Sequence, residues 1–356
     1  MVDTVKLMLL KGQYAINSAD FRYSSKQNGV HRAIRNPSLS ELDAGVYLPR
    51  CTLVNRPIRG GMSESLIVEF SAPKLLFGNN FDELNDNDFD KVIDRLIKAL
   101  AYLRIDIART DVIDAKVVGW HPSKNVVLGD TFGCRTVINA LQGVSVSKIY
   151  GVQKTDFTDG EVLHFHCNSK DIAFYDKIAD LRKSKVSDKR ALENHNRIQS
   201  GMLEQTKDVS VLRFEIRLNG IRAIKHAYSF EPTFQTLFSS SLSQTVLIRD
   251  WRKLTKDIDY LSLDTTSPLS IFEGFLSENS SITPRTALAA TASVIIANQV
   301  GAGILRNRLD KQFGSYAWRS IRPLIKTPQA HRFKSVLEVD AALNNFKPTR
   351  LSMLLR

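Results

Sequence analysis

Apolar and polar residues alternate in several short segments of the chain, which is the pattern of β-strands that are buried on one face. The alternation is clearest in VSVLRFEIRL, residues 209–218. Its apolar positions are Leu212, Phe214, Ile216 and Leu218, and its polar positions are Arg213, Glu215 and Arg217. Successive side chains of a strand point to opposite faces, so we expect one face on a core and two arginines around a glutamate on the other.

Further strands are predicted at residues 4–10, 64–78 and 115–128, the last one broken or bent at Pro122. The runs EVLHFH and DIAFYDK, separated by the polar turn 167–170, predict a β-hairpin.

In an even register of this hairpin, His164 would lie opposite Tyr175, and His166 opposite Ala173. A slip of one residue would turn both histidines to the other face. The even register therefore places two histidines, Tyr175 and Lys177 on one surface, which the polar side chains of residues 209–218 could join.

Helical spacing of apolar residues appears in other segments. The predicted helices span residues 82–103, 131–143 and 281–299, and the charged segment 181–208 is predicted to be a solvated helix. The first helix begins with acidic residues, which favour the positive end of a helix dipole. The second ends at Gly143, and the third begins with Ser281 or Thr283 as its cap and Pro284 in its first turn.

The order of these elements predicts an α+β fold with an antiparallel sheet, followed by a smaller basic helical domain. We expect a first domain at residues 1–230, a helical connector at 231–280 and the basic domain at 281–356. The last segment holds 12 Lys and Arg against 3 Asp and Glu, a balance of +9. Its central cations, interleaved with Phe313, Tyr316 and Trp318, are Arg306, Arg308, Lys311, Arg319, Arg322 and Lys326.

The whole chain has 356 residues, 43% hydrophobic residues and a net charge of +12. A positive balance of this size favours nucleic acid as a partner, although a merely basic protein has the same composition. Its three cysteines, Cys51, Cys134 and Cys167, are too few and too scattered for a disulfide framework. The apolar stretch near the start is too short for a signal peptide, and residues 286–303 predict a buried helix, so we expect a cytoplasmic protein without a membrane partner.

The residues expected around Tyr175 suit one reaction class. A tyrosine hydroxyl can attack a phosphodiester and hold the bond as a phosphotyrosine, but with a pKa of about 10 it needs a nearby cation. A divalent metal polarises the phosphate, and carboxylate, imidazole and water ligands suit Mg²⁺ or Mn²⁺. Each signal also has an ordinary explanation: a surface Tyr–Lys pair, a chance His-Phe-His run, or an exposed ion-pair ladder.

Two motifs carry a family resemblance. IAFYDKIADLRKSK, followed about thirty residues later by VLRFEIRLNGIRAIK, resembles the replication-associated endonuclease of filamentous phages and related phage and plasmid replication initiators. The segment 115–128 and the helical C-terminal region are also similar to that family, so that the likeness covers about residues 100–335.

The resemblance implies a rolling-circle initiator that nicks one origin strand, stays on the 5′ phosphate through tyrosine, and rejoins the ends. Tyr175 matches the nucleophile, Lys177 the adjacent cation, and Glu215 the acid on the neighbouring strand. His121 falls at a metal-ligand position, and His164 and His166 are further ligand candidates that rank below it. The expected DNA-binding residues are Arg182, Lys183, Arg213, Arg217, Arg306, Arg308, Arg319 and Arg322.

The sequence departs from other rolling-circle enzymes because its His-Phe-His run lies only nine to eleven residues before Tyr175. The implied partners are single- and double-stranded origin DNA, and a host helicase or polymerase. The competing function is a non-catalytic protein that binds an origin or regulates transcription. A tyrosine recombinase is a weaker alternative, because the chain shows no catalytic Arg-His-Arg set in a helical context.

Overall fold

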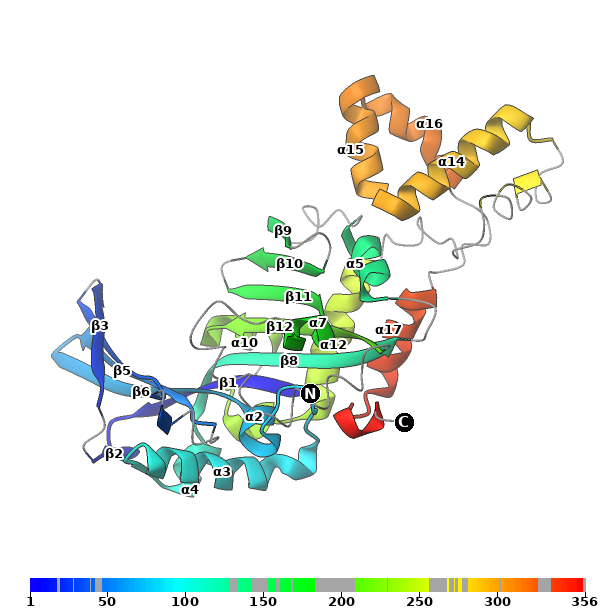
Figure 1. Ribbon diagram of the computed structural model, residues 1–356. Helices are drawn as coiled ribbons and strands as arrows, with labels where there is room; N and C mark the ends of the chain where they lie inside the picture. Colours follow the sequence, from blue (N-terminus) through cyan, green and yellow to red (C-terminus); the bar gives the residue numbers. More distant parts are fainter. Residues whose placement is uncertain are drawn as a thin grey trace.

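The computed structural model describes residues 1–128, 133–142, 153–182, 209–255, 281–325 and 334–354, with 268, 272, 275 and 276. Within these ranges, positions 18–19, 28, 39, 42–46, 158–160, 168, 229 and 301 are not described. The described chain is an α+β structure built on one large antiparallel sheet (Figure 1). The predicted α+β class with an antiparallel sheet is therefore confirmed at this level.

Ten strands form this sheet in the order β3-β4-β5-β6-β1-β8-β12-β11-β10-β9. Their bounds are β1 Val2–Leu10, β3 Arg22–Gln27, β4 Val30–Arg35, β5 Arg50–Ile58, β6 Gly61–Ser71, β8 Lys116–Leu128, β9 Gln153–Phe157, β10 Val162–Cys167, β11 Lys170–Asp176 and β12 Ser210–Asn219. A small second sheet pairs β2 Tyr14–Ile16 with β7 Ile105–Ile107.

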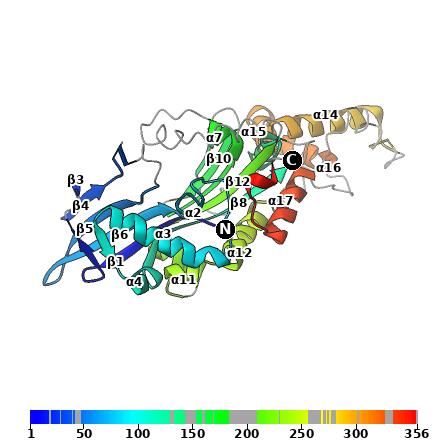
Figure 2. The same cartoon turned by 60° about the horizontal axis from the view of Figure 1, so that its bottom comes forward.

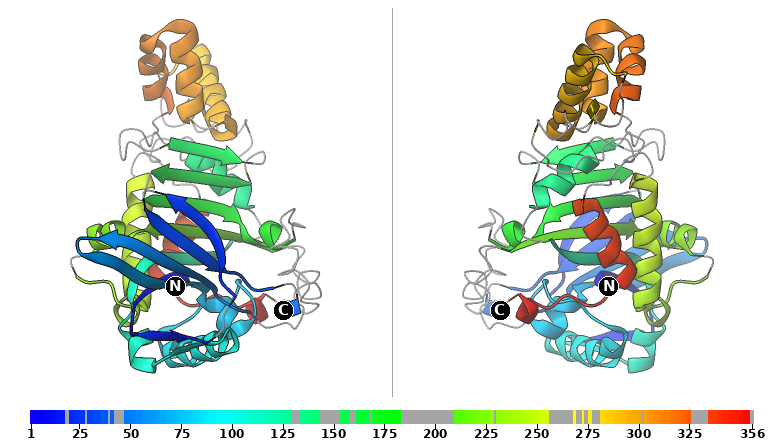
Figure 3. Two further views of the ribbon diagram at one scale, coloured as in Figure 1. Left: turned by 90° about the vertical axis from the view of Figure 1, so that its left-hand side faces the viewer. Right: turned by 90° about the vertical axis from the view of Figure 1, so that its right-hand side faces the viewer.

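Helices cover one face of the large sheet, as Figure 3 shows for α12 Ser240–Thr255 and α17 Lys334–Asn345. The remaining helices near the sheet are α2 Ala72–Phe77, α3 Phe89–Tyr102, α4 Arg109–Ile113, α5 Cys134–Gln142, α10 Ile221–Ala227 and α11 Phe234–Leu237. Trp251 of α12 packs against Phe174 and Phe214, with ring centroids 6.0 and 6.1 Å apart. The buried residues Val5, Leu7 and Leu9 of β1 belong to the same core.

The other face is called the open face here, and it is marked by the alternate residues Thr4, Lys6 and Met8 of β1, which are only partly buried. Since paired residues of antiparallel strands share a face, the register extends this face to Glu215 and Tyr175. Figure 2 shows the curved sheet from another side.

Several predicted boundaries are wrong. The predicted strand 64–78 ends at Ser71, because the Ser71 hydroxyl caps α2 by accepting the Lys74 amide and Pro73 stands in the first turn of that helix. The predicted helix 82–103 is split: a short 3₁₀ turn, η1 Asp86–Asp88, capped by the Asn85 side chain, precedes α3.

The predicted strand around Pro122 continues through β8, but its pairing with β12 has a gap between Glu215–Ser123 and Leu218–Trp120. Proline cannot donate a backbone hydrogen bond, which accounts for the gap.

The hairpin register also differs from the prediction. His164 pairs with Ala173 and His166 with Asp171, so the pairing is shifted by two residues. A shift of two preserves the face, and both histidines therefore still share the face of Tyr175. Lys177 does not continue the strand as expected; it begins α7 Lys177–Arg182, and its side chain is 1% exposed.

The basic helical region contains α14 Pro284–Val300, α15 Ala302–Phe313 and α16 Ser315–Ile325, which pack on one another. Thr283 precedes α14, and its hydroxyl accepts the Thr286 amide at 3.3 Å, as expected for a cap. After α16 the chain returns to the sheet through α17 and the short turn η4 Leu351–Met353 (Figure 1). Thus α12, expected in the connector, and α17, expected in the basic domain, both pack on the sheet; the domain limits stay a prediction.

Within the described residues, no helix combines the length and apolarity needed to cross a membrane.

Candidate active site

Glu215 is the centre of a charged cluster on the open face. Its side chain is 5% exposed. The Tyr175 hydroxyl donates to Oε2 of Glu215 at 3.2 Å, and the Arg217 Nε donates to Oε1 at 2.8 Å. Nδ1 of His121 lies 3.5 Å from Oε1, and Nε of Arg213 lies 3.6 Å from Oε2. The structure thus brings Tyr175, Glu215, His121, Arg213 and Arg217 together. The alternation predicted that Arg213, Glu215 and Arg217 could join Tyr175, and His121 was a candidate only through the family resemblance.

The strand register explains why these five residues meet. Tyr175 pairs with Arg213 across β11 and β12, and Glu215 pairs with Ser123 of β8. His121 is two residues before Ser123 on the same face, beside the gap in the pairing at Pro122. The polar side chains of the cluster therefore come from three adjacent strands of one sheet, β11, β12 and β8.

The electrostatics of the cluster hold Glu215 ionised and Tyr175 neutral. Burial alone would raise the pKa of Glu215, but the contact with His121 and the charges of Arg217 and Arg213 outweigh it and hold that pKa well below its usual value. Burial, followed by the charge of Glu215, raises the pKa of Tyr175 well above 10. Tyr175 is thus a phenol whose proton points to a carboxylate.

Lys177 lies next to this phenol. Its Nζ is 5.8 Å from the centroid of the Tyr175 ring and 4.0 Å from Oδ2 of Asp180. Burial lowers the pKa of Lys177 to about 7, and the charge of Arg213 acts in the same direction. Burial thus makes Lys177 easier to deprotonate than an exposed lysine, whereas the family resemblance implies a cation at this position.

Arg213 is a buried member of the cluster that links Glu215 to neighbouring acceptors. Its guanidinium is 2.9 Å from Oδ2 of Asp3 and donates to Oδ1 of Asn125 at 3.1 Å and to the Asn80 carbonyl at 3.3 Å. With a side chain only 2% exposed, Arg213 orients Glu215 and cannot present itself to DNA, contrary to expectation. Arg217, which is 32% exposed, can reach a phosphate.

The other histidines of the hairpin lie at the edge of the cluster. Nδ1 of His164 is 3.1 Å from Asp171, and Asp171 contacts Arg217 at 3.1 Å. His164 is thus joined to Glu215 through Asp171 and Arg217, and it does not reach Glu215 directly. His166 lies one pair further along the same face, opposite Asp171.

A divalent metal fits the pair His121 and Glu215 better than it fits the hairpin histidines. Nδ1 of His121 is the ring nitrogen that faces Glu215, 3.5 Å from Oε1, so a shared metal would lie between this nitrogen and the carboxylate. Mg²⁺ is commonly held by one or two protein ligands, with water and substrate phosphate completing the shell. In the described part of the chain, no three His, Cys, Asp or Glu side chains converge as a complete metal site.

Sequence reasoning missed three members of the cluster. Asp171 could have been found, because it is four residues before Tyr175 and hence on the same face of the strand. Asp3 could not, because the register of β1 on β8 shifts between Val2 and Thr4. Asn125 reaches Arg213 from a strand far away in the sequence.

The predicted DNA-binding residues of the helical region are on its surface. Arg308, Arg319 and Arg322 are exposed on α15 and α16, and Arg306 is partly exposed, with its Nε 3.3 Å from Asp310. Phe313 is 71% exposed and Tyr316 is 77% exposed, and both lie in the same part of the chain as these arginines. Arg182 ends α7, whereas Lys183, Lys326 and most of the segment 181–208 fall outside the described residues.

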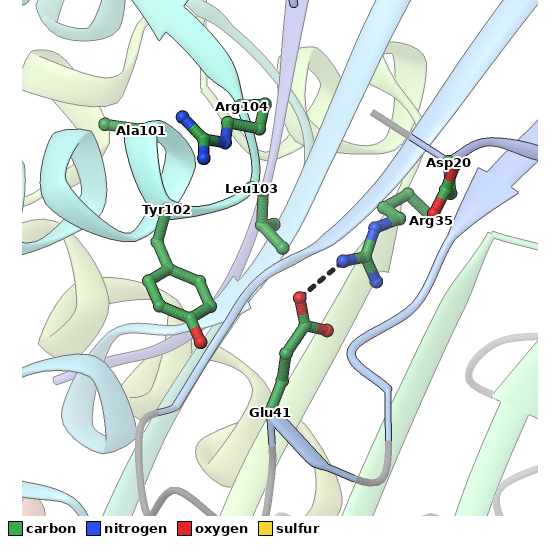
Figure 4. Close-up of a pocket in the computed structure, with 7 residues that line it drawn as sticks. All are labelled: Asp20, Arg35, Glu41, Ala101, Tyr102, Leu103 and Arg104. Atoms are coloured by element: carbon green, nitrogen blue, oxygen red, sulfur yellow. Dashed lines mark hydrogen bonds and ion pairs between the residues drawn. The ribbon is translucent and has the colours of Figure 1, made fainter. Parts of the chain in front are cut away.

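A separate cavity of about 550 Å³ lies away from this cluster (Figure 4). It is lined by Asp20, Arg35, Glu41, Ala101, Tyr102, Leu103 and Arg104. Arg35 pairs with Cys51 of the buried core, so this cavity is on the helix-covered face and not on the face of Tyr175. Arg35 and Glu41 neutralise each other at 2.5 Å.

Comparison with known proteins gives no relative: the chain matches no family model, no curated protein and no solved structure. The family resemblance and the activity that it implies therefore stay predictions, and the cluster around Glu215 has to be judged by its own geometry.

Proposed function

We propose that the chain is a metal-dependent DNA nicking and closing enzyme, an initiator of rolling-circle replication, in which Tyr175 is the nucleophile. One observation carries this proposal: the Tyr175 hydroxyl, on the sheet face opposite α12 and α17, is bonded to the ionised Glu215 and lies beside a lysine whose pKa is about 7. A tyrosine with only a structural role needs neither an ionised carboxylate as hydrogen-bond acceptor nor a lysine with a lowered pKa beside it.

In the proposed reaction, the Tyr175 oxygen attacks a backbone phosphorus. A bond forms between this oxygen and phosphorus, the bond from phosphorus to the 3′ oxygen breaks, and the leaving 3′ oxygen takes a proton from water to become a hydroxyl. The 5′ phosphate stays on Tyr175, and attack by a 3′ hydroxyl reverses the step and closes the strand. No oxidant or energy source is required, because one phosphodiester replaces another.

The phenol proton needs an acceptor. Neutral Lys177, whose Nζ lies 5.8 Å from the centroid of the Tyr175 ring, is the base that we propose, and a bridging water would carry the proton to it because the hydroxyl now donates to Glu215. A catalytic pKa near the working pH gives the best compromise between availability and basicity. Glu215 is too weak a base, with its pKa held well below the usual value, and orients the hydroxyl instead. Arg217 binds the phosphate, since its guanidinium reaches the surface.

The metal proposed for this site is Mg²⁺ or Mn²⁺, held by His121 and Glu215. When bound, it supplies a positive charge that polarises the scissile phosphate. It would also compete with Tyr175 and the arginines for the Glu215 carboxylate, which would remove the negative charge that now helps to keep the phenol protonated.

The test is nicking of supercoiled plasmid DNA that carries candidate origins, with and without Mg²⁺. We expect open-circular product and a denaturation-resistant protein–DNA adduct for the wild type. Tyr175→Phe should give neither product and should bind DNA with unchanged affinity, because phenylalanine keeps the ring and removes only the attacking oxygen. Persistent nicking by Tyr175→Phe would refute the assignment of the nucleophile.

A non-catalytic origin-binding protein is the alternative. It is favoured by the exposed arginines and aromatic rings of α15 and α16, which fit a DNA-binding surface without any chemistry. The same plasmid assay distinguishes the two functions, because only the enzyme changes the topology of the DNA.

A further inference from the structure

The β5–β6 hairpin extends beyond the rest of the sheet (Figure 1). β1 ends at Leu10, opposite Ser65, and β4 pairs with β5 only as far as Asn55. The residues beyond, 56–63, form a two-stranded ribbon closed by Arg59 and Gly60, and this segment is called the ribbon tip. Gly60 adopts a φ of 91°, a conformation that glycine allows without strain and that keeps the tip narrow.

The ribbon tip combines exposed cations with exposed apolar side chains. Arg56 and Arg59 are exposed, and Ile58 and Met62 are each 56% exposed. The surrounding segment, residues 22–62, contains 7 Lys and Arg against 2 Asp and Glu. Such a surface fits a groove of duplex DNA, where phosphates line the edges and the bases offer apolar groups such as thymine methyls on the floor.

The tip lies on the same open face as the cluster around Glu215. Thr4 of β1 pairs with His121 on one side and with Ser71 of β6 on the other. Further along this face the register aligns Lys6 with Glu69 and Arg50, and Met8 with Ile67, Thr52, Ile34 and Arg22. Lys6 bridges to Glu69 at 3.3 Å, and Arg32 and Arg56 follow on the same side towards the tip.

This face is longer than one turn of duplex DNA between the tip and Tyr175. From Ser71, which Thr4 separates from His121, to Gly61 at the tip there are ten residue steps of β6, and from His121 to Asn125, which is aligned with Tyr175 through Arg213, there are four more along β8. At about 3.4 Å for each residue this is a path of roughly 48 Å along the strands, or less where the strands coil. One turn of B-DNA is about 34 Å long, and its major groove, about 12 Å wide, admits a two-stranded ribbon.

We propose that the ribbon tip enters the major groove of duplex DNA more than one helical turn away from the strand bound at Tyr175. Arg56 and Arg59 contact phosphates or guanine edges, and Ile58 on one face of the ribbon and Met62 on the other contact apolar groups of the groove, including thymine methyl groups. The position relative to Tyr175 rests on the proposed function, but the binding of duplex by the tip does not.

The experiment measures DNA binding without cleavage, by fluorescence anisotropy in EDTA with the full chain. The probes are single strands of about ten nucleotides joined to mixed-sequence duplexes of about 5 or about 20 base pairs. The double variant Arg56→Ala/Arg59→Ala should lose about tenfold in affinity for the long duplex and less than twofold for the short one. Its salt dependence should fall by about 0.9 log unit per log salt for each phosphate contact removed.

Two variants make the result specific. Arg95→Ala/Lys98→Ala removes the same charge from the exposed surface of α3 and should leave both affinities unchanged. Ile58→Ala/Met62→Ala should weaken binding of the long duplex with no change of salt slope, because it removes no charge. Since all four tip residues are exposed, these changes should not affect folding, which circular dichroism verifies.

Equal binding of the long duplex by the tip variant and by the α3 variant would overturn the proposal, as would an equal loss for long and short duplexes. A chain that binds through the tip and yet never nicks DNA would instead refute the proposed function and leave duplex binding by the tip in place.

Discussion

Lys177→Met should make the protein more stable at neutral pH, although it removes a buried side chain. The ammonium group is buried beside Tyr175, and its nearest acid, Asp180, is 4.0 Å away. Methionine has a similar volume and no charge to desolvate. Replacing a buried charge by a hydrophobic residue often stabilises a protein by about 1–4 kcal/mol.

The magnitude follows from the pKa of Lys177, which burial lowers from 10.5 to about 7. At about 1.36 kcal/mol for each pKa unit, holding this group costs roughly 5 kcal/mol below pH 7 and about 4 kcal/mol at pH 7. Between pH 7 and 10.5 the unfolded state binds more protons than the folded state, so the wild type gains stability as the pH rises. The advantage of Lys177→Met should thus be about 2 kcal/mol or more at pH 6 and should vanish near pH 10.5.

Denaturant unfolding followed by tryptophan fluorescence at a series of pH values measures this difference. Lys124→Met is the matched control, because Lys124 is equally buried but donates to Glu83 at 2.6 Å and to Thr349 at 2.8 Å. Removing a partner from such a buried pair should cost about 3–5 kcal/mol. A Lys177 variant that is as destabilised as the Lys124 variant, or whose difference from wild type does not depend on pH, would refute the reasoning.

Other consequences concern catalysis. Lys177→Met should lower the nicking rate at least about a hundredfold and abolish the rise of the wild-type rate through pH 7, which a pH–rate profile in both proteins detects. Glu215→Gln should slow nicking by at least a few tens of fold with partial rescue by excess Mg²⁺, and wild-type activity at limiting metal would move the ligand role elsewhere. His121→Ala should weaken the metal dependence in the same direction, whereas His164→Ala should leave the metal concentration at half-maximal rate unchanged.

The polar face of residues 209–218 could be predicted from the sequence because its alternation is uninterrupted. Tyr175 and Glu215 were expected to meet, and they do, because a register shift of two residues leaves faces unchanged. The same alternation placed Lys177 on the strand, where it does not lie. Asp176 accepts the Ala179 amide at 2.8 Å, so the chain turns into α7 at this point.

What the sequence could not provide are contacts between distant segments. Arg213 was expected at the surface because the alternation of a strand shows which face a residue is on, but not whether other segments cover that face. The turn at residues 79–82 and Asp3 cover it in the fold, with Asn80 and Asn125 as further acceptors. The order of the ten strands also could not be predicted, because β1 lies between β6 and β8 and thereby joins the ribbon tip to the cluster in one sheet.

The way in which the chain ends on the sheet decides how the basic helical region can be tested. Thr349 donates its amide to Glu83 at 2.8 Å, and its hydroxyl, which accepts from Lys124, donates to the Asn125 carbonyl at 3.0 Å. A chain shortened near residue 280 would lose these bonds, which could unfold the sheet. A loss of DNA binding by such a chain would therefore not show whether DNA contacts of α15 and α16 or the fold itself had been lost.

The sharper variant is Arg308→Ala/Arg319→Ala, which changes two exposed side chains of α15 and α16 and keeps α17 in place. If these residues hold duplex DNA, affinity should fall and the salt slope should decrease by about 1.8, since each phosphate contact contributes about 0.9. Cleavage of short single strands should be unchanged, because the cluster around Glu215 is untouched. Thr349→Val serves as the control: it should destabilise the fold by about 1–3 kcal/mol and leave the salt slope as it is. An unchanged slope in the arginine variant would mean that α15 and α16 serve another partner, such as a host replication protein.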